Sequence, residues 1–82
     1  MDKNVDTSRM KRPIHQMPDW MTDAIAARGL AGKYRERPAY QQNDYVYWIT
    51  SPKTEATRQK RLSQMLDELE AGGVYMRMKW NG

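Results

Sequence analysis

The sequence predicts an all-α fold, a small bundle of three main helices plus a short connecting helix, with a disordered N-terminal arm and an extended C-terminal tail. Three observations lead to this prediction. The 82 residues are enough for one small domain. Apolar residues recur at helical spacing in the segment after residue 54. Proline and glycine separate the periodic segments at positions where helices begin and end.

The first 16 residues show neither helical nor strand periodicity, so we expect a disordered arm over residues 1–16. Its basic side chains are compatible with an unstructured leader or with an arm that binds nucleic acid, and they are Lys3, Arg9, Lys11 and Arg12. The helical domain is expected over residues 17–73 and the extended tail over residues 74–82.

The first helix is expected over residues 18–28 and is marked at both ends. Pro18 suits the first turn, where its missing N–H would be unpaired in any case. Gly29 fits the left-handed position that closes a helix, and Leu30 is the apolar residue that folds back in such a cap. Residues 31–37 are expected to form the short connecting helix.

The second helix follows Pro38 and is expected over residues 39–50, with Pro52 stopping it. The third helix begins at Thr54, which is a favoured N-cap residue type, and the glycines at 72–73 terminate it. The apolar stripes of the helices predict a core made of Ile25, Leu30, Tyr34, Tyr45, Trp48, Ile49, Leu62, Met65, Leu66 and Leu69.

The tail Val74–Trp80 alternates apolar and polar side chains, which is the period of a β-strand. A single strand on a helical domain has no sheet to join. Three arrangements are therefore open: docking as an extended tail, pairing with a strand of a partner, or remaining mobile.

The third helix is basic at its start and acidic at its end, the reverse of what the helix dipole favours. Local helix energetics therefore do not explain Arg58, Lys60 and Arg61. One explanation, besides plain solvation, is a tertiary ion pair from Arg58 or Arg61 to another helix. The available carboxylates are those of Asp19, Asp23 and Asp44.

The other explanation is an anion-binding site. A helix N-terminus offers unpaired amides and partial positive charge, and arginine binds phosphate through two parallel hydrogen bonds. The residues that would form this site, called the basic corner below, are Lys53, Thr54, Thr57, Arg58 and Arg61.

Two aromatic residues, Tyr40 and Tyr47, fall off the apolar stripe of the second helix, and we expect them to be exposed. Exposed aromatic rings beside basic residues can stack the bases of single-stranded nucleic acid. The net charge of +4 is compatible with such an anionic partner.

Other features of the sequence argue against several classes of protein. With one His and no Cys, a structural zinc site is nearly excluded. No apolar run reaches the ~18 residues that a membrane-spanning helix requires. His15 has no acid, Cys or second His nearby, and no catalytic motif is present. We therefore expect no enzyme activity, no cofactor and no membrane insertion, and a location in the cytoplasm.

The longest set of recognisable features lies in the second and third helices: Asp44-Tyr45-Val46, Trp48-Ile49, Lys53 and Glu55, Thr57-Arg58, and Arg61-Leu62. This pattern resembles the C-terminal module of the YdeI/OmpD-associated family, also called bacteriocin-protection proteins. Looser matches extend the resemblance to about Met17–Gly72, and they are Met17-Pro18-Asp19, Ala24-Ile25, Tyr34, Pro38, Leu66 and Gly72.

The chain departs from the family pattern at three positions. Pro52 stands where a small residue is typical, and Tyr40 where a capping Ser or Thr is common. Arg37 stands where an apolar residue is typical, so we expect the core to lose one contact there.

The resemblance implies a small helical bacterial domain tied by name to protection against bacteriocins or antimicrobial peptides, and it transfers no catalytic residue. We expect a non-enzymatic interaction module that contacts an unknown protein or anionic partner through the basic corner, as a monomer or weak dimer. The alternative is a nucleic-acid-binding protein that uses the same corner and the arm. A third interpretation is a docking subunit that needs Val74–Trp80 to complete a dimer.

Overall fold

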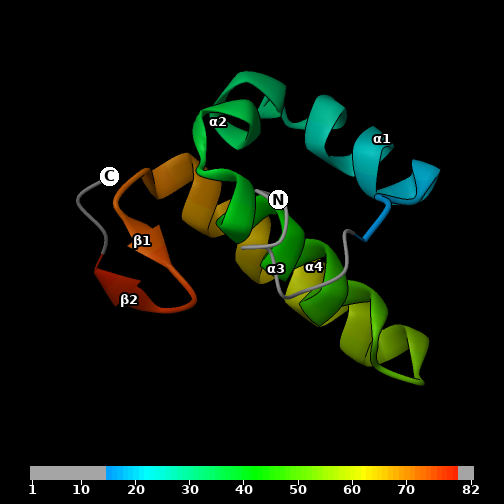
Figure 1. Cartoon of the computed structure of the whole chain (residues 1–82). Helices are drawn as coiled ribbons and strands as arrows, with labels where there is room; N and C mark the ends of the chain where they lie inside the picture. Colours follow the sequence, from blue (N-terminus) through cyan, green and yellow to red (C-terminus); the bar gives the residue numbers. More distant parts are fainter. Residues whose placement is uncertain (1–14, 80–82) are drawn as a thin grey trace, which may run out of the picture.

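The computed structural model describes residues 15–79 (Figure 1). Its elements are α1 (Asp19–Ala27), α2 (Ala31–Glu36), α3 (Ala39–Thr50), α4 (Glu55–Ala71), β1 (Val74–Tyr75) and β2 (Met78–Lys79). The prediction of a mostly helical fold with three main helices and a short connecting one is confirmed. Residues 1–14 of the expected arm, and residues 80–82 of the expected tail, lie outside the described residues.

Helices α3 and α4 lie side by side along most of their length, and α1 and α2 pack across one side of this pair (Figure 1). The connection from α3 to α4 is at one end of the pair, and the small sheet is at the other end (Figure 1). Within residues 15–79, no helix is both long and apolar enough to cross a membrane.

The end of α1 has the expected glycine cap. Gly29 has a φ of 68° and donates its N–H to the carbonyl of Ala26 at 2.9 Å. The N–H of Leu30 reaches the carbonyl of Ile25 at 3.0 Å, and the Leu30 side chain is buried. These two bonds define a Schellman motif, in which a glycine at positive φ lets the chain fold an apolar residue back onto the helix.

The ends of α4 are also as expected. The Thr54 hydroxyl accepts a hydrogen bond from the Thr57 N–H at 3.3 Å and so caps the first turn. Gly72 closes the helix at a φ of 87°, and its N–H donates to the carbonyl of Glu68 at 2.9 Å. Each of these residues satisfies a backbone group that the helix itself leaves unpaired.

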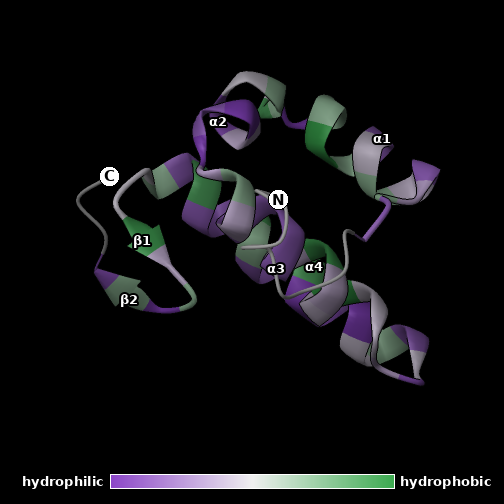
Figure 2. Cartoon of the chain, in the orientation of Figure 1, coloured by the Kyte–Doolittle hydropathy of each residue, from purple (hydrophilic) through white to green (hydrophobic). Residues whose placement is uncertain are grey.

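The core forms where α1, α2, α3 and α4 meet, and Figure 2 shows hydrophobic and hydrophilic stretches alternating along the helices, as expected when one face is buried. Nine of the ten expected core residues are buried. The prediction was wrong for Trp48, which is only half-buried at the edge of the core. Met21 and Val46 are buried core residues that the sequence prediction left out.

The segment after Gly73 differs from the expected single strand. β1 and β2 pair antiparallel, with Tyr75 opposite Met78, and the chain reverses at Met76 and Arg77. Tyr75 and Met76 pack against the core, so the segment docks on its own chain as a hairpin. The alternation of apolar and polar residues indicated strand geometry correctly but could not show a turn in its middle.

Candidate functional site

The basic corner lies where α3 ends and α4 begins, at the opposite end of the helix pair from the hairpin (Figure 1). Thr54, Thr57 and Arg58 are together in the first turn of α4, and Arg61 lies one turn further on. Lys53 is exposed in the connection between the two helices. The structure therefore brings the five predicted residues to one corner.

Arg61 holds the end of α3. Its Nη1 donates to the Trp48 carbonyl at 2.8 Å, and its guanidinium lies 5.2 Å from the centre of the Trp48 ring. In a continuing helix, that carbonyl would accept from the N–H of residue 52, but residue 52 is proline and has none. Arg61 thus supplies the donor that Pro52 cannot, and its position over the ring adds a cation–π contact.

Arg58 holds the connection itself. Its Nη1 donates to the Pro52 carbonyl at 2.6 Å, while its Nε and Nη2 lie 3.3 and 3.2 Å from Glu55 Oε1. The tertiary ion-pair explanation was wrong, because neither Arg58 nor Arg61 reaches the expected carboxylates of α1 or α3 in the described part of the chain. Arg61 instead contacts a carbonyl in the last turn of α3 and Arg58 a carbonyl just beyond it, near the helix end where the dipole of α3 favours positive charge.

The amides of the first turn of α4 are partly used. The Thr57 N–H is capped by Thr54, and the Arg58 N–H donates to the Thr54 carbonyl at 3.2 Å. Glu55 accepts from Gln59 Nε2 at 2.7 Å, and the hydrogen bonds from Gln59 and Arg58 lower the pKa of the Glu55 carboxyl. An anion arriving at the corner would therefore meet cationic side chains rather than a cradle of free amides.

The charge of the corner is nevertheless strongly positive. Residues 53–61 carry four cations, from Lys53, Arg58, Lys60 and Arg61, against the single carboxylate of Glu55. Both lysines are exposed, and the structure gives neither of them a salt-bridge partner among residues 15–79. This surface can attract an acidic group over a range of about 10 Å at moderate salt.

Sequence reasoning missed a buried polar cluster at the other end of α4. Glu68 is only 5% exposed, and its carboxylate accepts from Tyr45 Oη at 2.5 Å and from Gln64 Nε2 at 2.9 Å. It also accepts the backbone N–H groups of Met76 and Arg77, each at 2.9 Å. Burial alone would raise the pKa of Glu68, but these four hydrogen bonds outweigh it and lower the pKa.

Burial also raises the pKa values of two tyrosines, Tyr45 and Tyr34. Desolvation, together with the neighbouring Glu68 carboxylate, raises the pKa of Tyr45, and desolvation raises the pKa of Tyr34 to about 12. One signal in the sequence could have revealed the Glu68 cluster. Tyr45 was expected in the core, and a buried tyrosine hydroxyl usually needs a hydrogen-bond partner.

Arg37 belongs to the same region and corrects a further expectation. It was expected only to remove a core contact, yet its side chain is 4% exposed and hydrogen-bonded. Its Nη2 donates to the Glu68 carbonyl at 3.0 Å and its Nη1 to Gln41 Oε1 at 3.2 Å. The guanidinium thus ties the start of α3 to α4, which is an effect an apolar residue could not have.

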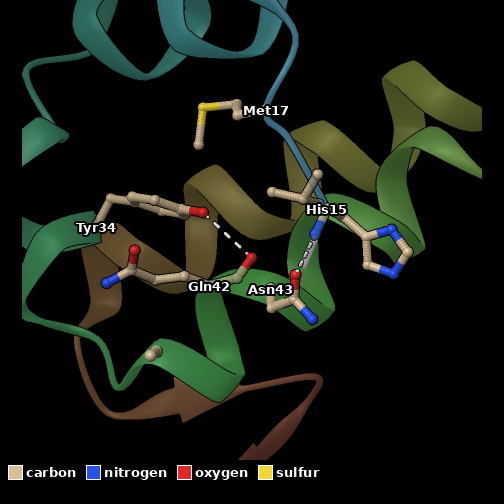
Figure 3. Close-up of a pocket in the computed structure, with 7 residues that line it drawn as sticks. His15, Met17, Tyr34, Gln42 and Asn43 are labelled. Atoms are coloured by element: carbon tan, nitrogen blue, oxygen red, sulfur yellow. Dashed lines mark hydrogen bonds between the residues drawn. The ribbon is translucent and has the colours of Figure 1, made fainter. Parts of the chain in front are cut away.

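A pocket of about 320 Å³ lies between the segment before α1, the α2 helix and α3, and its walls are His15, Met17, Tyr34, Ala39, Gln42, Asn43 and Val46 (Figure 3). Its polar groups are bonded to one another: Tyr34 Oη donates to the Gln42 carbonyl at 3.2 Å, and the His15 N–H donates to Asn43 Oδ1 at 2.7 Å. The His15 ring lies 4.8 Å from the Tyr47 ring. Among the residues that the structure describes, no carboxylate lines the pocket, and its described walls form an apolar slot with a hydrogen-bonded rim.

The comparisons with known proteins give one match. The model of the family described as bacteriocin-protection, YdeI or OmpD-associated, matches residues 15–72, which include the whole basic corner and stop before the hairpin. No curated protein and no solved structure gives a significant match. Because the family model covers well over half of the chain, the protein belongs to the bacteriocin-protection, YdeI or OmpD-associated family.

Proposed function

We propose that this protein is a non-enzymatic interaction module of the bacteriocin-protection type, which works in the cytoplasm and contacts an acidic partner protein through the basic corner. One observation carries the proposal. Residues 53–61 at the α3–α4 corner carry four cations and a single carboxylate, and two of these cations, Lys53 and Lys60, are exposed at the surface.

The fixed position of the two arginines supports a contact role. Arg58 is held by the Pro52 carbonyl of the connection and Arg61 by the Trp48 carbonyl of α3, so binding would cost them little additional side-chain freedom. An arginine has five N–H donors, and Arg61 uses one of them on the Trp48 carbonyl. The remaining donors can meet a carboxylate, and the two lysines would add attraction at longer range.

The sign of the charge also indicates the kind of partner. Amphipathic antimicrobial peptides carry Lys and Arg on their polar face. A basic corner would repel such a peptide, so direct capture of the toxic peptide at this surface is unfavourable. Protection would then act through an acidic cellular protein. Because β1 and β2 pair with each other within one chain, the hairpin forms without a strand from a second copy, and we expect a monomer or weak dimer.

The experiment that tests this proposal is a charge reversal at the exposed lysines. A double variant, Lys53→Glu and Lys60→Glu, is compared with wild type for binding to a fluorescent oligoglutamate peptide at low and moderate salt. The matched control is Lys33→Glu on α2, which is also an exposed lysine but lies outside the corner. We expect the double variant to lose binding and the control to keep most of it. Equal binding by all three proteins would contradict the proposal.

The second candidate is binding of single-stranded nucleic acid, and the exposure of Tyr47 favours it. This ring is 56% exposed on the helix that leads into the corner, and Tyr40 is 47% exposed, as the sequence predicted. A short single-stranded oligonucleotide in the same assay separates the two candidates. Tight binding that weakens steeply with salt and depends on Tyr47 would favour nucleic acid over an acidic protein.

A further inference from the structure

The turn of the hairpin is built from residues that do not favour it. Met76 and Arg77 have φ values of 51° and 65°, so both lie in the left-handed region. This is the geometry of a two-residue hairpin turn that normally uses Asn-Gly or Asp-Gly. Methionine and arginine carry a Cβ atom that disfavours this region, and each strand beside the turn has only two residues. The hairpin is therefore not stabilised by its own sequence.

The missing stabilisation comes from α4. The two carboxylate oxygens of Glu68 accept the consecutive N–H groups of the turn, Met76 on Oε1 and Arg77 on Oε2, each at 2.9 Å. Consecutive amides at positive φ form a concavity that binds an anion, and Glu68 fills it from within the same chain. Tyr45 and Gln64 supply two further hydrogen bonds that orient the carboxylate.

We propose that residues 74–79 form a flap that is docked on α4 by the ionised Glu68 carboxylate, and that opens as a unit when this charge is neutralised while the helices stay folded. Opening uncovers the Tyr45 hydroxyl and the part of the core against which Tyr75 and Met76 pack. The family match ends at residue 72, so the flap lies beyond the matched residues.

The groups that face Glu68 determine how the flap responds to pH. Tyr45 faces it from α3, Gln64 from α4, and Arg77 from the hairpin, where its Nε lies 3.1 Å from Gln64 Oε1. Arg37 contacts the Glu68 backbone carbonyl, and Asp44 accepts from Tyr75 Oη at 2.8 Å. Cations and donors outnumber carboxylates around Glu68, which is consistent with its lowered pKa.

A lowered pKa in the docked state fixes the direction of the effect. The contribution of Glu68 is fully present above the ordinary pKa of a glutamate and is lost as the pH falls through the lowered value. The flap is therefore docked at neutral pH and opens in acid. The same docked–open equilibrium of the flap would respond to a partner. A partner that binds Tyr45 or the turn amides would compete with Glu68 for them and would favour the open state.

Amide hydrogen exchange on the labelled full-length protein tests the proposal. The variant is Glu68→Gln, and the matched control is Glu70→Gln, which removes a charge on the same helix at an exposed position paired with Arg28. We expect the Met76 and Arg77 amides to exchange about tenfold faster or more in Glu68→Gln, since a hydrogen bond to a charged group is the strong kind. The amides of Met65 and Leu66 should keep their wild-type rates, as should all amides in the control.

Two results would overturn the flap. Unchanged exchange at Met76 and Arg77 would show that Glu68 does not hold the turn, and equal acceleration at Met65 would show that the hairpin and α4 open together. A second variant keeps the test valid if Glu68→Gln folds poorly. In the double variant Glu68→Gln, Arg77→Gly, the glycine relieves the strained turn position. This double variant should therefore regain part of the protection at Met76 that Glu68→Gln alone loses. Wild-type protection factors, which correct each amide for the pH dependence of its intrinsic exchange rate, provide the same comparison from neutral to acidic pH without any substitution.

Discussion

At the scale of single residues, the fold depends on three charged side chains whose role the sequence does not reveal. Arg61 replaces the N–H that Pro52 lacks, Arg37 ties α3 to α4, and Glu68 organises the hairpin. The charges of α4 looked misplaced because they were judged within their own helix, and Arg37 looked only like the loss of a core contact. The positive charge of Arg61 is unfavourable near the N-terminus of α4. The same charge lies at the C-terminal end of α3, where the helix dipole favours it. Only tertiary structure could show which helix end each charge serves.

The Arg61 side chain gives a stability prediction. Arg61→Met keeps an apolar stem beside Trp48 but removes the donor to its carbonyl, so we expect a loss of about 1 kcal/mol or more in the free energy of unfolding. Urea unfolding monitored by circular dichroism measures the change. Lys60→Met is the control, because Lys60 is exposed, and its effect should stay within about 0.5 kcal/mol.

A double-mutant cycle then identifies the cause. Pro52→Ala restores an N–H at residue 52, so the cost of Arg61→Met should be smaller in the Pro52→Ala background. The same cost in both backgrounds would show that the Trp48 carbonyl is not the group that Arg61 serves.

The Tyr45 hydroxyl gives a prediction about pH. It donates to the Glu68 carboxylate in the core, and we expect Tyr45→Phe to cost about 1–3 kcal/mol at neutral pH. This hydrogen bond is the leading cause that lowers the pKa of Glu68, so its loss should raise that pKa toward the ordinary value. Urea unfolding at a series of acidic pH values should then show a smaller acid-dependent loss of stability than in wild type, and this loss should be complete at a higher pH. Tyr47→Phe, at an exposed position, should leave the acid response unchanged.

At the scale of elements, helix ends were predictable and the hairpin was not. Proline and glycine mark each boundary: α3 was expected over residues 39–50 and spans them, and the caps at Gly29, Thr54 and Gly72 form as expected. These residues act through the local backbone conformation, so their identity in the sequence is enough to predict where a helix ends. The turn at Met76 and Arg77 depends on a carboxylate eight residues away, so no local pattern could show it.

A matched pair of glycines tests the cap of α4. Added methyl groups at Gly72 and Gly32 would each meet no atom within 4 Å, so only backbone conformation differs between them. Gly72→Ala places a Cβ at a φ of 87° and should cost about 1–2 kcal/mol. Gly32→Ala, inside α2, should instead stabilise the protein by about 0.5–1 kcal/mol. Thermal unfolding of both variants provides the comparison, and destabilisation of equal size would contradict it.

At the scale of the whole molecule, α3 and α4 separate two different surfaces. One end of the pair carries the basic corner, where the arginines are fixed by backbone carbonyls and the lysines are exposed. The other end carries the hairpin and the buried Glu68 cluster. The sequence predicted the position of the corner, because a proline break followed by cations is visible in one stretch. It could not predict that Arg58 and Arg61 also hold the fold.

The measurement that tests the central claim most directly is an amide-shift NMR titration of the labelled protein. An oligoglutamate peptide and a short single-stranded oligonucleotide are added in turn, each at low and moderate salt. We predict that the acidic peptide shifts the amides of residues 53–61, that the shifts fade with salt, and that they disappear in the Lys53→Glu, Lys60→Glu variant. Shifts that avoid residues 53–61, or that persist in this variant, would contradict the assignment of the basic corner as the contact surface.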